Sequence, residues 1–175
     1  MTQGPIEWKR VSSPAKRAAL LGLLSGLAVA LSALEGLIPP LPFMPPGAKA
    51  GLSNIATMFA ACYIGLPGAL SVAIIKSLFV LITRGGTSFF MSIAGGLVST
   101  VFMWLLLRFG KFGLVGTGIA GAVAHNSAQL AVSILLTGTP ALLYYYPALL
   151  VFAMAAGSIT GIILKVVLSA TQRLL

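Results

Sequence analysis

The segment from Leu114 to Leu136 contains no Asp, Glu, Lys or Arg, and it constrains the fold more than any other feature of the chain. An apolar segment needs about 20 residues to cross the hydrocarbon core of a bilayer as a helix. In lipid, the backbone must satisfy its own hydrogen bonds, which a helix does within one segment. The same character extends over the chain, since only 7% of the residues are charged, against about 25% in soluble domains. The sequence therefore predicts an all-α integral membrane protein.

Turn residues and charges divide the apolar pattern into six expected transmembrane helices. We expect them at Ala18 to Ile38, Gly51 to Gly65, Ala69 to Thr83, Ser88 to Leu107, Leu114 to Leu136 and Ala141 to Leu168. The prolines between Pro39 and Pro46 exclude a helix there. The second and third helices are short, which suits little tilt or a partly re-entrant course. The predicted architecture is a six-helix membrane domain over residues 18–168, with an N-terminal segment 1–17 and a C-terminal tail 169–175.

The basic residues fall mainly on one side of this topology. If the N-terminus is cytoplasmic, the inside segments hold eight of them: Lys9, Arg10, Lys16, Arg17, Arg108, Lys111, Lys165 and Arg173. The outside loops hold two, Lys49 and Arg84. This distribution follows the positive-inside rule, so both termini are expected in the cytoplasm. Because the charges are scattered at segment ends rather than collected in a run, we expect no nucleic-acid partner.

The helix expected at Leu114 to Leu136 carries the only histidine of the chain. Gln129 lies four residues after His125 and three after Asn126, so the three form one polar patch on the helix surface. Unpaired polar side chains are costly in hydrocarbon, and these three should face the protein interior or a cavity. The patch is the first candidate binding site. The alternative is that it only forms hydrogen bonds with neighbouring helices.

Lys76 falls near the middle of the third expected helix. A lysine at that depth costs about 2.5 to 3.5 kcal/mol on insertion scales, so it faces a partner, a ligand or water. Alternatively, it snorkels to the interface along its four-carbon stem. Glu35 and Arg84 are expected near the external face. The predicted solute site consists of Asn54, Lys76, Arg84, His125, Asn126 and Gln129. The basic members of this set, with Lys49, favour an anionic solute that has hydrogen-bonding groups.

The sequence lacks the residues that several kinds of chemistry require. The chain contains no aspartate, and its only glutamates are Glu7 and Glu35, so clustered carboxylate ligands for Mg²⁺ are missing. No Gly-rich phosphate loop of the ATPase type occurs. The single cysteine, Cys62, excludes an intrachain disulfide and a thiolate metal cluster. We expect no metal, no cofactor and no enzymatic activity. A proton-coupled carrier stays open, because His125 or Glu35 could titrate.

The first expected helix carries a ridge of small residues. Ala18, Gly22 and Gly26 recur every four residues, and Ala30 continues the series. Small side chains let another helix approach closely. The ridge therefore either packs within this bundle or docks a partner subunit.

Four motifs resemble the Gx transporter family, often labelled heptaprenyl diphosphate synthase component I. They are Gly51-Leu52-Ser53-Asn54-Ile55, Ser92-Ile93-Ala94-Gly95-Gly96, Gly121-Ala122-Val123-Ala124-His125-Asn126 with Gln129, and Gly138-Thr139-Pro140-Ala141-Leu142-Leu143-Tyr144-Tyr145. The resemblance covers about Ala18 to Leu168. The family is similar in architecture to the S components of energy-coupling factor (ECF) transporters.

The resemblance implies a six-helix subunit of a bacterial plasma membrane that binds a small solute on the outer side. The solute would be a vitamin, a cofactor precursor or an isoprenoid-related compound. A separate transmembrane scaffold and paired ATPases would then power transport. S components dock through small residues on helix one, and Ala18, Gly22 and Gly26 occupy comparable positions, with glycines in place of the usual alanines. The alternatives are an accessory subunit of prenyl-diphosphate or quinone biosynthesis, and a structural partner in a redox assembly.

Overall fold

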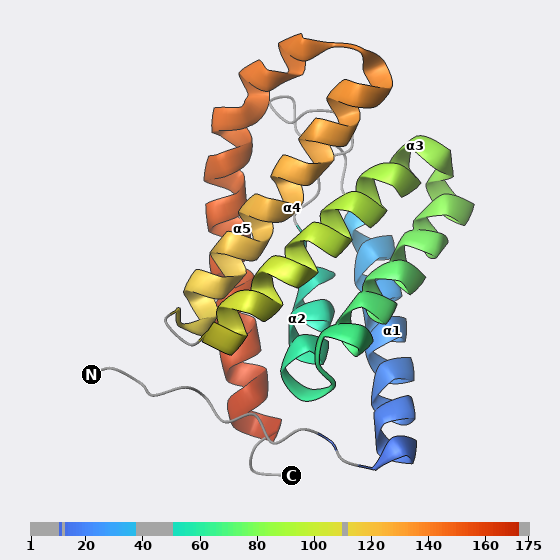
Figure 1. The fold of residues 1–175 in the computed structure, drawn as a ribbon, viewed down its shortest axis with the longest axis vertical. Helices are drawn as coiled ribbons and strands as arrows, with labels where there is room; N and C mark the ends of the chain where they lie inside the picture. Colours follow the sequence, from blue (N-terminus) through green and yellow to red (C-terminus); the bar gives the residue numbers. More distant parts are fainter. Residues whose placement is uncertain (1–10, 12, 38–50, 110–111, 172–175) are drawn as a thin grey trace.

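The computed structural model describes residues 11, 13–37, 51–109 and 112–171. Its elements are α1 (Pro14–Leu37), α2 (Asn54–Tyr63), α3 (Leu66–Phe109), α4 (Leu114–Thr137), the 3-10 helix η1 (Pro140–Tyr145) and α5 (Tyr146–Thr171). Every regular element in these ranges is helical, which confirms the predicted all-α class. Figure 1 shows the helices gathered into one bundle.

Gly85 bends α3 into two arms, residues 66–84 and 86–109. Its φ of 81° and ψ of −179° are non-helical and are readily adopted only by glycine. Figure 1 shows the two arms folded back beside one another, with the bend at one end of the bundle. The predicted break between the third and fourth helices is therefore confirmed. The turn expected over residues 84–87 is reduced to a single non-helical residue.

α2 is shorter than predicted. Gly51 has a left-handed φ of 77°, so the helix starts at Asn54 and not at Gly51. Its 10 residues rise about 15 Å, half of a hydrocarbon core of about 30 Å. Among the residues that the structure describes, four helical segments are long and apolar enough to cross a membrane: Pro14–Leu37, Leu66–Phe109, Leu114–Thr137 and Pro140–Ala170.

The ends of the remaining helices follow local chemistry. α1 starts at Pro14, four residues before the predicted Ala18, because proline suits the first position of a helix. α4 matches its prediction within one residue and ends where Gly138, at a φ of 63°, donates its N–H to the Ile134 carbonyl. The segment Pro140–Tyr145 is a 3-10 helix, not the start of an α-helix as predicted. The last helix therefore begins at Tyr146 and continues to Thr171.

α4 and α5 pack backbone against backbone through glycines. A Cβ atom added to Gly157 would lie 2.5 Å from the Ile119 Cα, and one added to Gly161 would lie 2.5 Å from the Val115 Cα. Gly118 faces the same crossing, against the backbone of Gly157 and Gly161. This is the small-residue mode of helix association in membranes, and a side chain at any of these glycines would separate the two helices.

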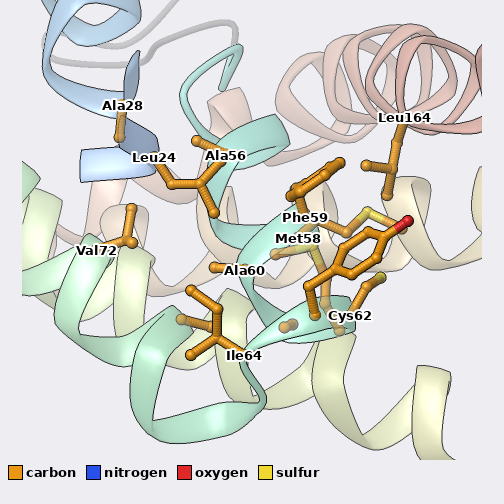
Figure 2. Close-up of a cluster of buried hydrophobic side chains, with 14 of the residues drawn as sticks. Leu24, Ala28, Ala56, Met58, Phe59, Ala60, Cys62, Ile64, Val72 and Leu164 are labelled. Carbon is orange, nitrogen blue, oxygen red and sulfur yellow. The ribbon is translucent and has the colours of Figure 1, made fainter. Parts of the chain in front are cut away.

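The core surrounds α2, which is buried along nearly all its length. Figure 2 shows Met58 and Phe59 of α2 near Leu164 of α5, with Leu24 of α1 and Val72 of α3 also in the cluster. The outward positions of the long helices are apolar instead: Leu23, Ile82, Leu135 and Val151 are all at least two-thirds exposed. Apolar outward faces around a partly polar interior are what a bilayer requires, and the chain is a membrane protein.

Candidate functional site

The side chains of Glu35, Ser53, Asn54 and Lys76 form a buried polar cluster, here called the Glu35–Lys76 cluster, between α1, α2 and α3. Each of the four is at most 6% exposed. Lys76 Nζ donates to Ser53 Oγ at 3.2 Å and to Asn54 Oδ1 at 3.4 Å. Ser53 Oγ in turn donates to Glu35 Oε2 at 3.4 Å. The two charged groups thus meet at one serine hydroxyl.

The cluster lies at the N-terminus of α2. The backbone N–H of Ser53 donates to Glu35 Oε1 at 3.4 Å, so the carboxylate accepts both donors of this residue. The first N–H groups of a helix have no partner within the helix and carry a partial positive charge, which favours an anion beside them. Glu35 supplies that anion from α1. Its negative charge also compensates the ammonium group of Lys76, without which a buried lysine would be strongly unfavourable.

His125 and Gln129 of α4 form a second polar cluster against the second arm of α3. Ser99 Oγ lies 3.4 Å from His125 Nδ1 and also donates to the Gly96 carbonyl at 3.2 Å. Gly95 leaves the space for both α4 side chains, because a Cβ there would lie 3.0 Å from the imidazole Cε1 and 2.9 Å from the Gln129 Cγ. The histidine, glutamine and serine are buried, so their polar atoms face the protein interior.

A pair of serines joins the arms of α3 between the two clusters. Ser77 Oγ and Ser92 Oγ are 3.1 Å apart, and both residues are buried. Ser77 follows Lys76 directly, whereas Ser92 precedes Gly95 and Ser99 on the inner face of the second arm at helical spacing. The facing sides of the two arms therefore carry hydroxyl groups between the Glu35–Lys76 cluster and the cluster of His125 and Gln129.

Asn126 is buried on α4 next to His125. The following residue, Ser127, has its hydroxyl 3.0 Å from the hydroxyl of Tyr146, the first residue of α5. Tyr144 and Tyr145 are exposed by 89% and 40%. Tyr146 thus contacts the helix that carries the polar patch.

Arg84 lies apart from these contacts. Its Nη2 donates to the Ser32 carbonyl of α1 at 2.6 Å, and its guanidinium lies against Gly36. Both residues are in the last turns of α1, where the negative end of the helix dipole makes a cation favourable. The guanidinium of Arg84 thus caps α1 from the bend of α3.

The family model described as heptaprenyl diphosphate synthase component I matches residues 24–167. The chain belongs to this family. The match covers the bundle from the middle of α1 to the last turns of α5, and both polar clusters lie inside it. Among curated proteins, none matches the chain.

One solved structure, described as the S component of a bacterial ECF transporter, resembles this component I family member. The TM-score is 0.56 over 92% of this chain and 95% of that chain, at 20% sequence identity. At that identity the likeness shows the fold, because one fold can carry unrelated functions. The expected relation of this family to the S-component architecture is thereby confirmed.

The small-residue ridge of this family member points away from the bundle. Ala18, Gly22 and Gly26 are exposed. A Cβ atom added to Gly22 or Gly26 would meet nothing within 4 Å. The alternative that the ridge packs within the bundle is therefore wrong for these glycines. The glycines at which two helix backbones meet inside the bundle are Gly118, Gly157 and Gly161.

The structure brings together some of the predicted site residues and separates others. Lys76 and Asn54 are in contact and buried, so Lys76 does not snorkel to the interface. His125 and Gln129 meet at Gly95, as the helical spacing predicted. Arg84 contacts the Ser32 carbonyl of α1 instead. Lys49 lies outside the described residues.

The predicted site left out Glu35, Ser53 and Ser99. Ser53 contacts Lys76, Ser99 contacts His125, and Glu35 accepts hydrogen bonds from Ser53. Glu35 carries a usable signal, since it is one of two acidic residues and lies in an apolar segment. The serines carry none, because hydroxyl groups are common on membrane helices and also form hydrogen bonds with their own backbone. In the part of the chain that the structure describes, no group of three or more His, Cys, Asp or Glu residues could hold a metal ion.

Proposed function

We propose that the protein is the solute-binding membrane subunit of an ECF-type importer, which captures a small polar solute on the outer side of a bacterial plasma membrane. A separate transmembrane scaffold and ATPase subunits power the transport. The main support is the S-component fold over nearly the whole chain, combined with two buried polar clusters inside that fold. A bundle that only had to fill a bilayer would need neither a buried Lys76 nor a buried Glu35, since both are costly there.

The solute site, in this proposal, is lined by Asn54, Lys76, His125, Asn126 and Gln129, with the hydroxyl groups of α3 between the clusters. Intramembrane ionisable groups are most often functional, and these face the interior. Asn54 is on α2, Lys76 is on α3, and the other three residues are on α4. A solute between the two clusters would therefore contact all three helices. Arg84 contributes through its position at the bend, which fixes α1 relative to α3.

In the proposed orientation, both termini are in the cytoplasm. The proposed architecture is the six-helix bundle of an S component. The start of α1 and the end of α5 lie at the same end of the bundle in Figure 1, and the bend of α3 lies at the other. Lys16 and Arg17 belong to the first end and Arg84 to the second. The positive-inside rule supports a cytoplasmic first end.

The exposed ridge Ala18, Gly22 and Gly26 is the proposed docking surface for the scaffold subunit. It lies on the cytoplasmic half of α1, whereas Glu35 lies on the other half of the same helix. Solute capture and partner docking would therefore use opposite ends of one helix.

The deciding experiment is expression of the chain with and without a candidate scaffold and ATPase module in cells that lack their own. Mass spectrometry identifies small molecules released from the purified protein, and uptake of each released compound is then measured. We expect a specific compound to be retained, and its uptake to require the ATPases. Retention without any module-dependent uptake would contradict the importer role.

The name of the family supports a second function, an accessory subunit without catalytic residues that serves prenyl-diphosphate or quinone biosynthesis. The apolar outward faces of the helical bundle would suit a membrane anchor for a soluble prenyltransferase. Affinity purification separates the two functions: ATPase and scaffold subunits would be recovered with an importer, and a prenyltransferase with an accessory.

A further inference from the structure

The Glu35–Lys76 cluster already contains its own anion. Glu35 accepts the N–H and the hydroxyl of Ser53 at the N-terminus of α2, the place where an anionic solute would otherwise be stabilised. Lys76 reaches the same hydroxyl from α3. The positive charge that a buried lysine would offer to a solute is therefore balanced within the protein.

Because Glu35 compensates the charge of Lys76, the site favours a different kind of solute. A second anion beside Glu35 would place two like charges close together in a medium of low dielectric constant, where their repulsion is large. A solute without net charge avoids this repulsion and leaves the pair intact. The sequence alone favoured an anion, because it does not show that Lys76 is linked to Glu35 through Ser53 or that Arg84 donates to the Ser32 carbonyl.

Lys76 still has one donor for such a solute. An ammonium group has three N–H donors, and two are directed at Ser53 Oγ and Asn54 Oδ1. Within the described ranges, no further acceptor is within hydrogen-bonding distance of Nζ. One acceptor, such as a carbonyl oxygen or a ring nitrogen, would complete the set.

We propose that the Glu35–Lys76 cluster selects a solute with no net charge, which presents a hydrogen-bond acceptor to Lys76 while Glu35 keeps the site neutral. This inference rests on the proposed solute-binding function and assigns the chemical class of its ligand. Uncharged donors and acceptors in the second cluster, at Gln129 and Ser99, match the same kind of molecule.

The test uses acetamide and acetate, which have nearly the same shape and differ in charge. Each is titrated against the full-length protein in detergent at constant ionic strength, and the thermal unfolding midpoint reports binding. We expect acetamide to raise the midpoint of the wild type and acetate to leave it unchanged. The Lys76→Met variant should lose the response to acetamide.

Glu35→Gln removes the compensating charge and leaves Lys76 free to take an anion. This variant should bind acetate about tenfold more tightly than the wild type does, the gain expected from one hydrogen bond to a charged group. The double variant Glu35→Gln with Lys76→Met should lose that gain and serves as the charge-matched control. If Glu35→Gln does not fold, the comparison of acetamide and acetate on the wild type still tests the proposal.

Two results would overturn the proposal. One is stabilisation of the wild type by acetate through Lys76, and the other is indifference of both the wild type and Glu35→Gln to both probes. A zwitterion, like an uncharged amide, has no net charge, so glycine and glycinamide are compared next. Glycine is a zwitterion, whereas glycinamide has a protonated amine and a net positive charge. Binding of glycine alone indicates a zwitterionic solute. These outcomes are independent of uptake, so failure of the importer role is recognised separately, by absent transport with an intact probe pattern.

Discussion

Arg84 Nη2 donates a hydrogen bond of 2.6 Å to the Ser32 carbonyl, which connects the bend of α3 to the last turns of α1. The two residues are 52 positions apart. A second arginine has the same role at the other end of the bundle, where Arg17 Nη2 donates to the Ile64 carbonyl after α2 at 3.2 Å. Each guanidinium thus donates to a backbone carbonyl near the C-terminal end of a neighbouring helix, where a cation is favourable.

Replacing Arg84 by Ala should destabilise the bundle by about 1 to 2 kcal/mol. A hydrogen bond from a charged donor contributes about 1.5 to 3 kcal/mol, and part of this is lost because the group is only partly buried. Thermal unfolding in detergent measures the change. Arg108→Ala is the matched control, since Arg108 lies over the Trp104 ring of its own helix, with the guanidinium carbon 5.3 Å from the ring centroid. Equal losses in the two variants would argue against a specific role for the Ser32 contact.

Gly157→Leu should prevent α4 and α5 from packing. The Ile119 Cα would lie 2.5 Å from the new Cβ atom, and backbone atoms cannot move aside as a flexible side chain can. We expect loss of the monodisperse peak in size-exclusion chromatography and a lower unfolding temperature. Gly22→Leu adds the same side chain at a glycine with open surroundings and should unfold like the wild type. A destabilised Gly22→Leu would mean that the outward face of α1 is not free.

Gly22→Leu and Gly26→Leu should instead affect the docking of a partner. Close approach of two membrane helices requires small residues at the contact, and leucine would hold a scaffold helix away. Recovery of scaffold and ATPase subunits with the variant, and uptake by the complete transporter, should both decrease. Retention of the solute by the isolated variant should be unchanged. Normal recovery of the partners in both variants would exclude this ridge as the docking surface.

His125→Ala and Asn126→Ala should each weaken solute binding about tenfold to a hundredfold, if each removes one hydrogen bond to a polar solute group. The measurement is equilibrium binding of the compound that the purified wild type retains. Ser158→Ala is a suitable control, because Ser158 only donates to the Met154 carbonyl on an exposed position of α5. Unchanged affinity in both α4 variants would reduce the patch to helix packing.

The proposed orientation predicts which positions are accessible from outside intact cells. Cysteines are placed at Thr139, between α4 and η1, and at Phe112, just before α4, in a Cys62→Ser background. Both positions are exposed, and Cys62 itself is buried. A membrane-impermeant maleimide should label Thr139→Cys and leave Phe112→Cys unlabelled until the membrane is opened. The opposite labelling pattern would reverse the topology.

The sequence predicted well those helices whose ends depend on nearby residues. α4 was predicted within one residue because Gly138 provides the left-handed cap that ends it. The break at Gly85 was also foreseen from the adjacent glycines. The start of α2 was missed because Gly51 could begin a helix or precede one, and only its φ of 77° decides between them.

The candidate site was harder to predict, because its contacts join residues that are distant in the chain. His125 and Gln129 share a helix, and their spacing alone placed them together. The contact of Lys76 with Ser53, however, spans 23 positions and depends on how α2 enters the bundle. Helical periodicity indicates which face of a helix is polar and says nothing about which neighbouring helix faces it.

The shortness of α2 has a consequence for the biogenesis of the protein. A segment of 10 residues is too short to be integrated by the translocon as an independent span. α2 and the first arm of α3 are joined at Gly65, whose φ is 91°, so the two can enter the bilayer as one helical hairpin. Glu35 would already be in the membrane with α1 at that moment. Arrival of the hairpin would bring Ser53 and Lys76 to the carboxylate in a single step, which makes insertion of α1 a precondition for stable insertion of the next two segments.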